Sequence, residues 1–291
     1  MPPFNEVFCD ALSVTYHPDD SCLCDCLPFL ESIGFNISYS SDDVVMLHAD
    51  VNTFARLETK STFHKVEVKG SALEFLRSSG MFSAFLGLLG SCNHTVTRID
   101  AALDVAKDFP SVLHGIRTRF PDGYCRVSRK KGKITELLEP RDSDGKRSGT
   151  LYVGSKNGRA RKFARIYDKQ LESLVKRAEL VEPRTRYEFV IREDVTLRDA
   201  LEPSGLFWHF MGIDLLKRPS DAPEWRKGAS YGWHMEKREY LPAERLVRYL
   251  DASASLSRMV EIADEIGPNG RSYLLAQLRK KFEGGTTFES L

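Results

Sequence analysis

The sequence lacks the features that would place the chain in a membrane or outside the cell. No stretch approaches the roughly 18 consecutive apolar residues that a membrane-spanning helix needs. The N-terminus, Met-Pro-Pro-Phe-Asn-Glu, has neither the basic region nor the apolar region of a secretory signal. Six cysteines in 291 residues are too few for a disulfide framework. We therefore expect a cytoplasmic protein with reduced thiols and no membrane partner.

Several signatures of catalysis and metal binding are also missing. No G-x-x-x-x-G-K-[ST] loop occurs, which argues against built-in ATP-driven unwinding. No G-x-S-x-G elbow and no zinc-finger spacing is present, and His48, His64 and His94 stand alone rather than in a His-x-His pair.

The composition is that of an ordinary globular protein, with 42% apolar and 29% charged residues. Alternating and helical apolar patterns predict the main elements. The expected strands cover residues 7–17, 44–49, 63–69, 95–105, 150–154, 163–169 and 184–192, with a helix at 72–89 and a hairpin at 124–138 that turns near Lys131-Gly132. Because strands follow strands with few helices between them, we predict an α+β fold whose core is a mainly antiparallel sheet with packed helices.

The chain divides most naturally near Pro219–Pro223. Residues 1–218 would form the catalytic domain, and residues 219–291 a helical C-terminal region with helices at 243–252, 256–266 and 271–282. The last of these is basic and amphipathic, so the tail is expected to bind DNA, to dimerise or only to pack.

The net charge of +1 conceals a strong internal asymmetry. Residues 1–60 hold ten acids and two bases, a charge of −8, whereas residues 115–169 hold sixteen bases and six acids, a charge of +10. A basic segment of this size favours a polyanionic partner over a solvated loop. The candidate DNA-binding residues are Arg126, Arg129, Lys130, Lys131, Lys156, Arg159, Arg161 and Lys162.

The basic segment ends with Arg165-Ile166-Tyr167-Asp168-Lys169. A tyrosine is a poor nucleophile at its free pKa of about 10, but two flanking cations could stabilise its phenolate and clamp a phosphate. Glu172 lies five residues after Tyr167 and could act either as a general base for the phenol or as part of a salt bridge. The competing interpretation of Tyr167 is a half-buried strand residue with solvated neighbours.

Carboxylates on a second strand are candidate metal ligands. Asp100 and Asp104 share one face of the expected strand at 95–105, and two such carboxylates are costly to bury without a cation between them. Mg²⁺ or Mn²⁺ suits these oxygen ligands. Alternatively, Asp100 pairs with Arg98, and Asp104 caps the following loop. Glu67 and Glu188 are further candidates that could equally lie on solvated faces.

Five segments in this order resemble the replication initiation factors of rolling-circle plasmids, and the related initiators of filamentous phages and nicking proteins of conjugative transposons. They are VFCDALSVTYH, HKVEVKG, TRIDAALDVAKDF, TLYVGSKNGRARKFARIYDKQLE and TRYEFVIR, and the resemblance spans residues 7–192. It implies that Tyr167 is the nucleophile and that Asp100, Asp104 and Glu67 belong to the metal site. Arg165 and Lys169 then become contacts of the scissile phosphate.

The resemblance implies a nicking-joining endonuclease. Such an enzyme cuts one strand of unpaired or hairpin origin DNA, keeps the new 5′ end as a phosphotyrosine and leaves a 3′-OH that primes synthesis. Without a helicase of its own, it would need a host helicase and polymerase in a bacterial cell, and a homodimer is plausible. The sequence leaves open a relaxase of a mobile element, a non-catalytic DNA-binding regulator of the same family, and an enzyme or scaffold unrelated to nucleic acid.

Overall fold

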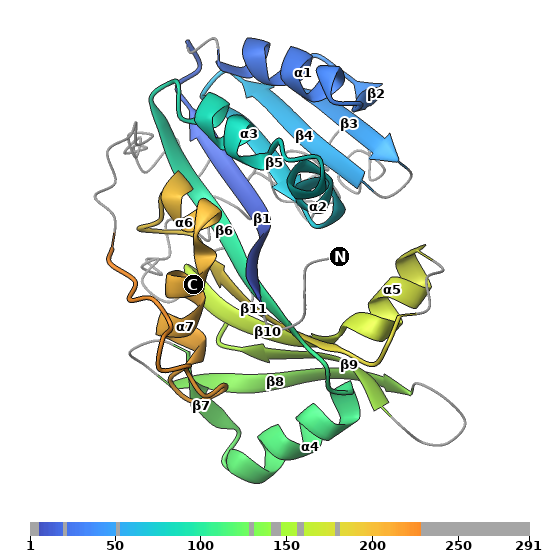
Figure 1. Cartoon of the computed structure of the whole chain (residues 1–291), viewed down its shortest axis with the longest axis vertical. Helices are drawn as coiled ribbons and strands as arrows, with labels where there is room; N and C mark the ends of the chain where they lie inside the picture. The colour runs from blue at the N-terminus through green and yellow to red at the C-terminus, as the bar shows by residue number, and fades with distance from the viewer. Residues whose placement is uncertain are drawn as a thin grey trace, which may run out of the picture. The chain divides into compact units, whose positions relative to one another are not determined.

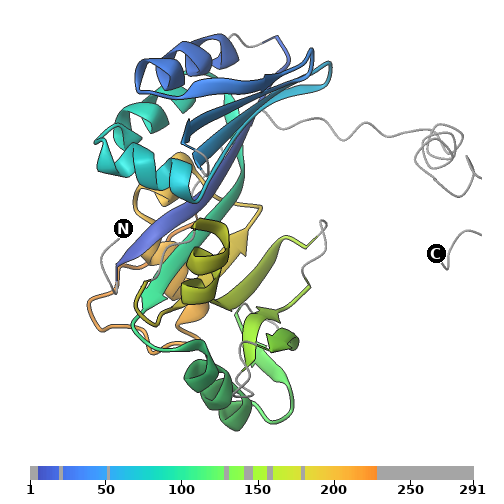
Figure 2. The same ribbon diagram turned by 90° about the vertical axis from the view of Figure 1, so that its right-hand side faces the viewer.

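The computed structural model describes residues 6–227 without 20–21, 51–52, 128–130, 141–146, 156–159 and 178–180. An antiparallel sheet organises this part of the chain (Figure 1), and Figure 2 shows the same ribbon turned by 90°. Its strands are β1 (Val7–Tyr16), β2 (Asn36–Ser40), β3 (Val44–Asp50), β4 (Thr53–Lys60), β5 (Phe63–Lys69), β6 (His94–Val105), β7 (Tyr124–Arg126), β8 (Lys131–Pro140), β9 (Arg147–Val153), β10 (Lys162–Asp168) and β11 (Thr185–Ile191). The helices are α1 (Cys22–Ser32), α2 (Ser71–Ser78), α3 (Phe82–Leu89), α4 (Phe109–Arg119), α5 (Lys169–Arg177), α6 (Leu197–Leu201) and α7 (Pro203–Met211).

The strand order is β2-β3-β4-β5-β1-β6-β11-β10-β9-β8-β7, and the paired neighbours are antiparallel. The predicted α+β class with a mainly antiparallel sheet is confirmed. Strands distant in sequence meet at its centre, because β6 pairs with β1 on one side and with β11 on the other.

The two faces of the central strands differ in chemistry because successive side chains point to opposite sides. Leu12, Ile99 and Phe189 lie on one face and are fully buried. Phe189 stacks on Phe210 of α7 with ring centroids 4.3 Å apart, so α7 covers this apolar face. The other face carries charged side chains, and that face forms the site described below.

The predicted helix at 72–89 is two helices, α2 and α3, whose axes differ by 112°. Gly80 ends α2 in a left-handed conformation, with φ of 73°. The amides of Gly80 and Met81 then donate to carbonyls of the last turn, which closes α2 and turns the chain. Apolar periodicity continued across this cap, which is why the sequence predicted one helix.

Other local expectations differ from the structure as well. The 124–138 hairpin does not turn at Lys131-Gly132, because both residues belong to β8 and pair with β7, Lys131 with Arg126 and Gly132 with Cys125. Gly132 permits a close approach instead: a Cβ there would lie 2.8 Å from the amide nitrogen of Gly154. Strands β2 and β4, and helices α1, α4, α6 and α7, were not predicted individually.

Contacts divide the chain into two units, Met1–Met235 and Glu236–Leu291. The helices expected at 243–252, 256–266 and 271–282 lie outside the described residues. Within the described part no single helix is long and apolar enough to cross a membrane, and only the bent α2–α3 pair passes that test jointly by length and composition.

Candidate active site

A cavity of about 740 Å³ opens on the charged face of the sheet. It is bordered by strands that are remote in sequence, since β1, β3, β4, β6, β10 and β11 and the start of α5 all contribute. Its lining includes five residues singled out from the sequence: Asp100, Arg165, Tyr167, Lys169 and Glu172.

Tyr167 lies in β10, opposite Arg186 of β11, and only 8% of its surface is exposed. The guanidinium of Arg165 sits 5.5 Å from the centre of its ring, as in a cation–π contact. Burial raises the pKa of Tyr167 well above its usual value, and the positive charge of Arg186 opposes that shift. The phenol is therefore protonated at neutral pH, with cations placed to stabilise its anion.

Arg186 bridges two carboxylates beneath Tyr167. Its Nε and Nη2 donate to Asp104 at 2.6 and 2.8 Å, and its Nη1 donates to Asp10 Oδ1 at 2.9 Å. All three residues are buried. Burial alone would raise the pKa of Asp10, but the charges of Arg186, Lys169 and Arg165 together outweigh burial and lower that pKa. The triad holds two negative charges and one positive charge in the interior.

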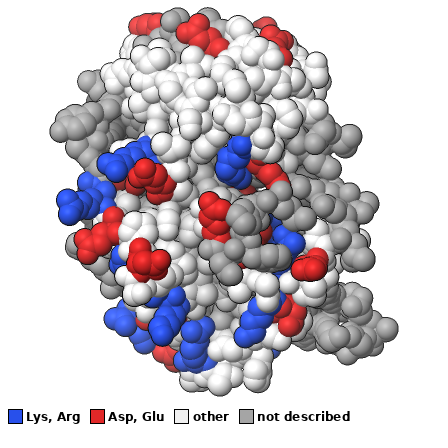
Figure 3. All heavy atoms as spheres, in the orientation of Figure 1, with Lys and Arg blue, Asp and Glu red and all other residues white. Residues whose placement is uncertain are grey.

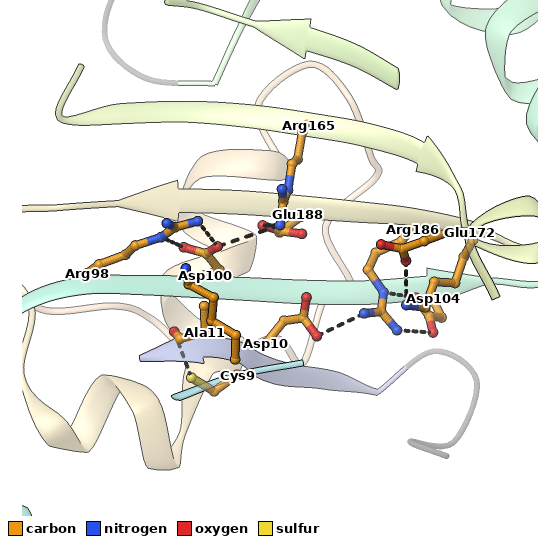
Figure 4. Close-up of polar contacts among 12 residues, drawn as sticks. Cys9, Asp10, Ala11, Arg98, Asp100, Asp104, Arg165, Glu172, Arg186 and Glu188 are labelled. Atoms are coloured by element: carbon orange, nitrogen blue, oxygen red, sulfur yellow. Dashed lines mark hydrogen bonds and ion pairs between the residues drawn. The ribbon is translucent and has the colours of Figure 1, made fainter. Parts of the chain in front are cut away.

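A second group surrounds Asp100 and Glu188, both fully buried (Figure 4). Arg98 donates to both oxygens of Asp100, at 2.7 and 2.5 Å, and Arg165 Nη2 lies 2.5 Å from Glu188 Oε1 in an ion pair. Burial raises the pKa of Glu188 well above its usual value, Arg165 partly offsets that rise, and the neighbouring Asp100 adds to it. Figure 4 shows Asp10, bound to Arg186, on the side of the first group that faces Asp100.

The four predicted metal ligands are thus divided among separate partners. Asp100 pairs with Arg98, which was the alternative considered for it, whereas Asp104 binds Arg186 rather than capping a loop. Glu67 pairs with Lys65 and Lys69, and these bonds outweigh burial and lower its pKa to about 2. Among the described residues, no three His, Cys, Asp or Glu side chains are grouped to hold a metal ion.

Glu188 nevertheless has the chemistry of a cation ligand. Its carboxylate is buried and forms an ion pair with Arg165, and neither oxygen meets the geometry of a hydrogen bond with a described residue, so both keep lone pairs for a cation. Asp100 beside it supplies further hard oxygen atoms of the kind that Mg²⁺ and Mn²⁺ bind. Glu188 and Asp100 therefore fit a divalent cation better than Asp104 or Glu67 does.

Lys169 and Glu172 occupy a helix rather than the predicted end of a strand. Strand β10 stops at Asp168, whose Oδ1 accepts from the amide of Leu171 and thereby starts α5. Lys169 Nζ lies 2.6 Å from Glu172 Oε2 one turn later. Burial and the charge of Arg186 lower the pKa of Lys169. The helix start brings both side chains to the cavity that contains Tyr167.

The predicted DNA-binding residues that the structure describes are paired with acids. Arg126 reaches Asp214, Lys131 reaches Asp122, and both Arg161 and Lys162 reach Glu193. Figure 3 shows the result on the face it draws, where blue and red side chains intermingle over the lower half. Arg129, Lys130, Lys156 and Arg159 lie outside the described residues.

Sequence reasoning missed Asp10 and Arg186 as site residues. In a regular strand Asp10 would share the buried face with Leu12, but the register of β1 shifts between Cys9 and Ala11 and turns it to the cavity. The sequence carried no sign of this bulge. Arg186 was detectable in principle, since it lies two residues before Glu188 and so on the same strand face.

Comparisons with known proteins bear on the family and the fold. Residues 94–201 match the replication initiation factor family, a span that contains Asp100, Tyr167 and Glu188. A search of curated proteins found no match. The structure is similar to that of a rolling circle replication initiator protein from Geobacillus stearothermophilus, with a TM-score of 0.51 and 15% identity over 78% of this chain and 93% of that one. The resemblance read from the sequence is confirmed: residues 94–201 match the replication initiation factor family, and the fold is similar to that of a rolling-circle initiator.

Proposed function

We propose that this protein nicks one strand of origin DNA by attack of Tyr167 on a backbone phosphate. The observation that carries the proposal is the placement of a buried tyrosine in a cavity that the cations Arg165, Lys169 and Arg186 also line. A phosphodiester entering this cavity would meet a nucleophile and its counter-charges together. The match to the replication initiation factors favours origin DNA as the substrate.

In the proposed reaction the Tyr167 oxygen forms a bond to phosphorus as the bond to the 3′ oxygen breaks. The products are a 5′-phosphotyrosine and a free 3′-OH, which can prime a polymerase. Because the phosphotyrosine keeps the energy of the broken ester, the strand can be rejoined without ATP. The phenolic proton must leave during attack, since burial holds the pKa of Tyr167 high.

We propose that Glu172 accepts the phenolic proton of Tyr167. Its charge and that of Asp10 both act on the pKa of Tyr167, so both carboxylates are near. Asp10 is a poor candidate, because Arg186, Lys169 and Arg165 together lower its pKa despite burial. Lys169 holds Glu172 by a 2.6 Å contact and is itself placed to bind the phosphate.

A divalent cation is part of the proposal, with Glu188 and Asp100 as the residues that would hold it. When bound, Mg²⁺ or Mn²⁺ would withdraw charge from the phosphate oxygens. Arg165 contacts Glu188 and approaches Asp100 at 3.8 Å, so it would orient both carboxylates. The role of Asp104 is then to fix Arg186 beneath the tyrosine.

Nicking requires unpaired DNA at the target, so an extruded hairpin is the expected substrate form, with a host helicase and polymerase acting afterwards in the bacterial cytoplasm. The test is a nicking assay with Mn²⁺ and hairpin oligonucleotides from a candidate origin. Tyr167→Phe should abolish nicking, whereas the control Tyr187→Phe should retain it. Tyr187 is the neighbouring tyrosine on β11, placed opposite Ile166 on the other face of the sheet. Full nicking by Tyr167→Phe would refute the proposal.

A further inference from the structure

The cavity that holds Tyr167 has a second wall of a different character. Opposite the charged residues of β6, β10 and β11, it is lined by Met46 and His48 of β3 and by Phe54 of β4. These side chains belong to a region that was acidic by sequence and carried no functional prediction. They also lie before residue 94, where the family match begins.

Their orientation is fixed by the strand register. His48 pairs with Phe54 across β3 and β4, and their rings lie 6.1 Å apart at an angle of 33°. The adjacent residues Leu47 and Ala55 are fully buried on the opposite, core-facing side. Strand alternation therefore directs His48 and Phe54 into the cavity, where both remain partly exposed. Neither His48 nor Phe54 belongs to the hydrophobic core of the described residues.

Cations lie elsewhere on the border of the same cavity. Lys69 of β5 lines it with 40% of its side chain exposed, and Arg98 lines it from β6. Strand β5 pairs with β4 on one side and with β1 on the other, so Lys69 comes from a strand between Phe54 and the β6 carboxylates. Aromatic rings with cations on one cavity surface suit a nucleotide, whose base stacks and whose phosphates need positive charge.

We propose that His48 and Phe54 form a stacking platform for a nucleobase of the single-stranded substrate, next to the phosphate that Tyr167 attacks. The proposal rests on the proposed function for the identity of the strand, and it adds a base-binding subsite to that function. A stacked base would hold the strand in one position along the cavity, so that one phosphate faces the tyrosine.

The test measures binding by fluorescence anisotropy of labelled oligo(dT) and of a matched oligonucleotide that lacks bases. The full-length chain carries Tyr167→Phe, so that no cleavage occurs. We expect the base-containing strand to bind about tenfold more tightly, in line with the stacking of a single base on an aromatic side chain. Phe54→Ala should remove most of this preference while leaving the affinity for the baseless strand unchanged.

Tyr39→Ala is the matched control, because Tyr39 is an exposed aromatic residue on β2, next to β3, and does not line the cavity. Its base preference should match that of the Tyr167→Phe parent. Phe54→Leu and His48→Ala repeat the test with smaller disturbance of the sheet, and thermal melting confirms that each variant folds.

Two results would overturn the inference: equal affinity of the parent for both oligonucleotides, or equal loss of affinity for both in Phe54→Ala and Phe54→Leu. Failure of the proposed function gives a different pattern. In that case the base preference depends on Phe54, but the protein with Tyr167 intact forms no covalent adduct with DNA.

Discussion

At the scale of single residues, two arginines organise this site, the buried Arg186 and the partly exposed Arg165. Arg186 joins Asp10 and Asp104 beneath the tyrosine, and Arg165 joins Glu188 beside Asp100. A buried charge left without its partner is far more costly than a missing surface pair. The arginines therefore hold the carboxylates on the cavity face and supply positive charge close to the phenol.

Replacing Arg186 should show how much the buried triad contributes. Arg186→Met leaves Asp10 and Asp104 unpaired in the interior, so we expect the free energy of unfolding to fall by about 3–5 kcal/mol. Urea titration measures the change. The control is Arg198→Ala, which removes an ion pair with Glu202 at a side chain that is 84% exposed, and which should cost no more than about 0.5 kcal/mol. Equal effects of the two substitutions would contradict the assigned role.

The raised pKa of Glu188 predicts that the stability of the folded protein depends on pH. Its pKa in the folded protein lies well above the value of 4.5 expected after unfolding, so the folded state binds the proton more tightly. The resulting stability is fully present below pH 4.5 and is lost as pH rises toward the folded pKa. Glu188→Gln removes this dependence. Melting curves recorded in EDTA should show the stability of the variant, relative to the unmodified protein, increasing with pH above about 4.5; a constant difference would rule out the raised pKa.

At the scale of elements, the site depends on how strands and helices begin and bend. The end of β10 at Asp168 and the immediate start of α5 bring Lys169 and Glu172 toward Tyr167, and the bulge in β1 brings Asp10. The long strands at the sheet centre were predictable, because each has a run of strand-forming residues. The bulge, the cap at Gly80 and the start of α5 were not, because they depend on backbone conformations that apolar periodicity does not report.

The same limit explains which site residues were found. Tyr167, Asp100 and Glu188 stand in short motifs whose residue types already suggest chemistry. Their partners were harder to assign: Arg186 is separated from Asp104 by 82 residues and from Asp10 by 176, and only the pairing of β1, β6 and β11 brings the three together. Spacing along one strand could show that Asp100 and Asp104 share a face, but it could not show that different arginines bind them.

The start of α4 offers a test of local helix stabilisation. Asp108 is its N-cap, with Oδ1 accepting from the Ser111 amide at 2.9 Å, and this bond lowers the pKa of the carboxyl. We expect Asp108→Ala to reduce the free energy of unfolding by about 1 kcal/mol. Asp108→Asn should keep most of the cap but lose its pH dependence, since the contribution of the aspartate disappears as pH falls below 3.8 toward the lowered pKa. Guanidine titrations at pH 3 and pH 7 distinguish the three proteins.

At the scale of the whole molecule, the basic excess of residues 115–169 does not form a uniform positive surface over the described residues. Acids from other segments meet several of these cations, as Asp214 meets Arg126 and Glu193 meets Arg161. The sequence total thus indicated an anionic partner without locating its binding surface. Within the described part, the cations best placed for a DNA backbone are those that line the cavity, such as Lys69 and Arg165.

Salt dependence of binding can separate the two sets of cations. Each phosphate contact on single-stranded DNA contributes about −0.7 to the slope of log affinity against log salt concentration. Lys69→Met should therefore make that slope shallower by about 0.7 on oligo(dT). Arg126→Met should leave it unchanged, because Arg126 does not line the cavity. A larger change of slope in Arg126→Met than in Lys69→Met would indicate that the DNA binds outside the cavity.

The central claim is that Tyr167 becomes covalently joined to DNA, and mass spectrometry of the trapped adduct tests it most directly. The full-length protein is incubated with Mn²⁺ and an origin hairpin, digested, and searched for a nucleotide-bearing peptide. We predict a single modified peptide that contains Tyr167, linked to the 5′ phosphate of the cut strand. An adduct on any other residue, or the same adduct formed by Tyr167→Phe, would contradict the claim.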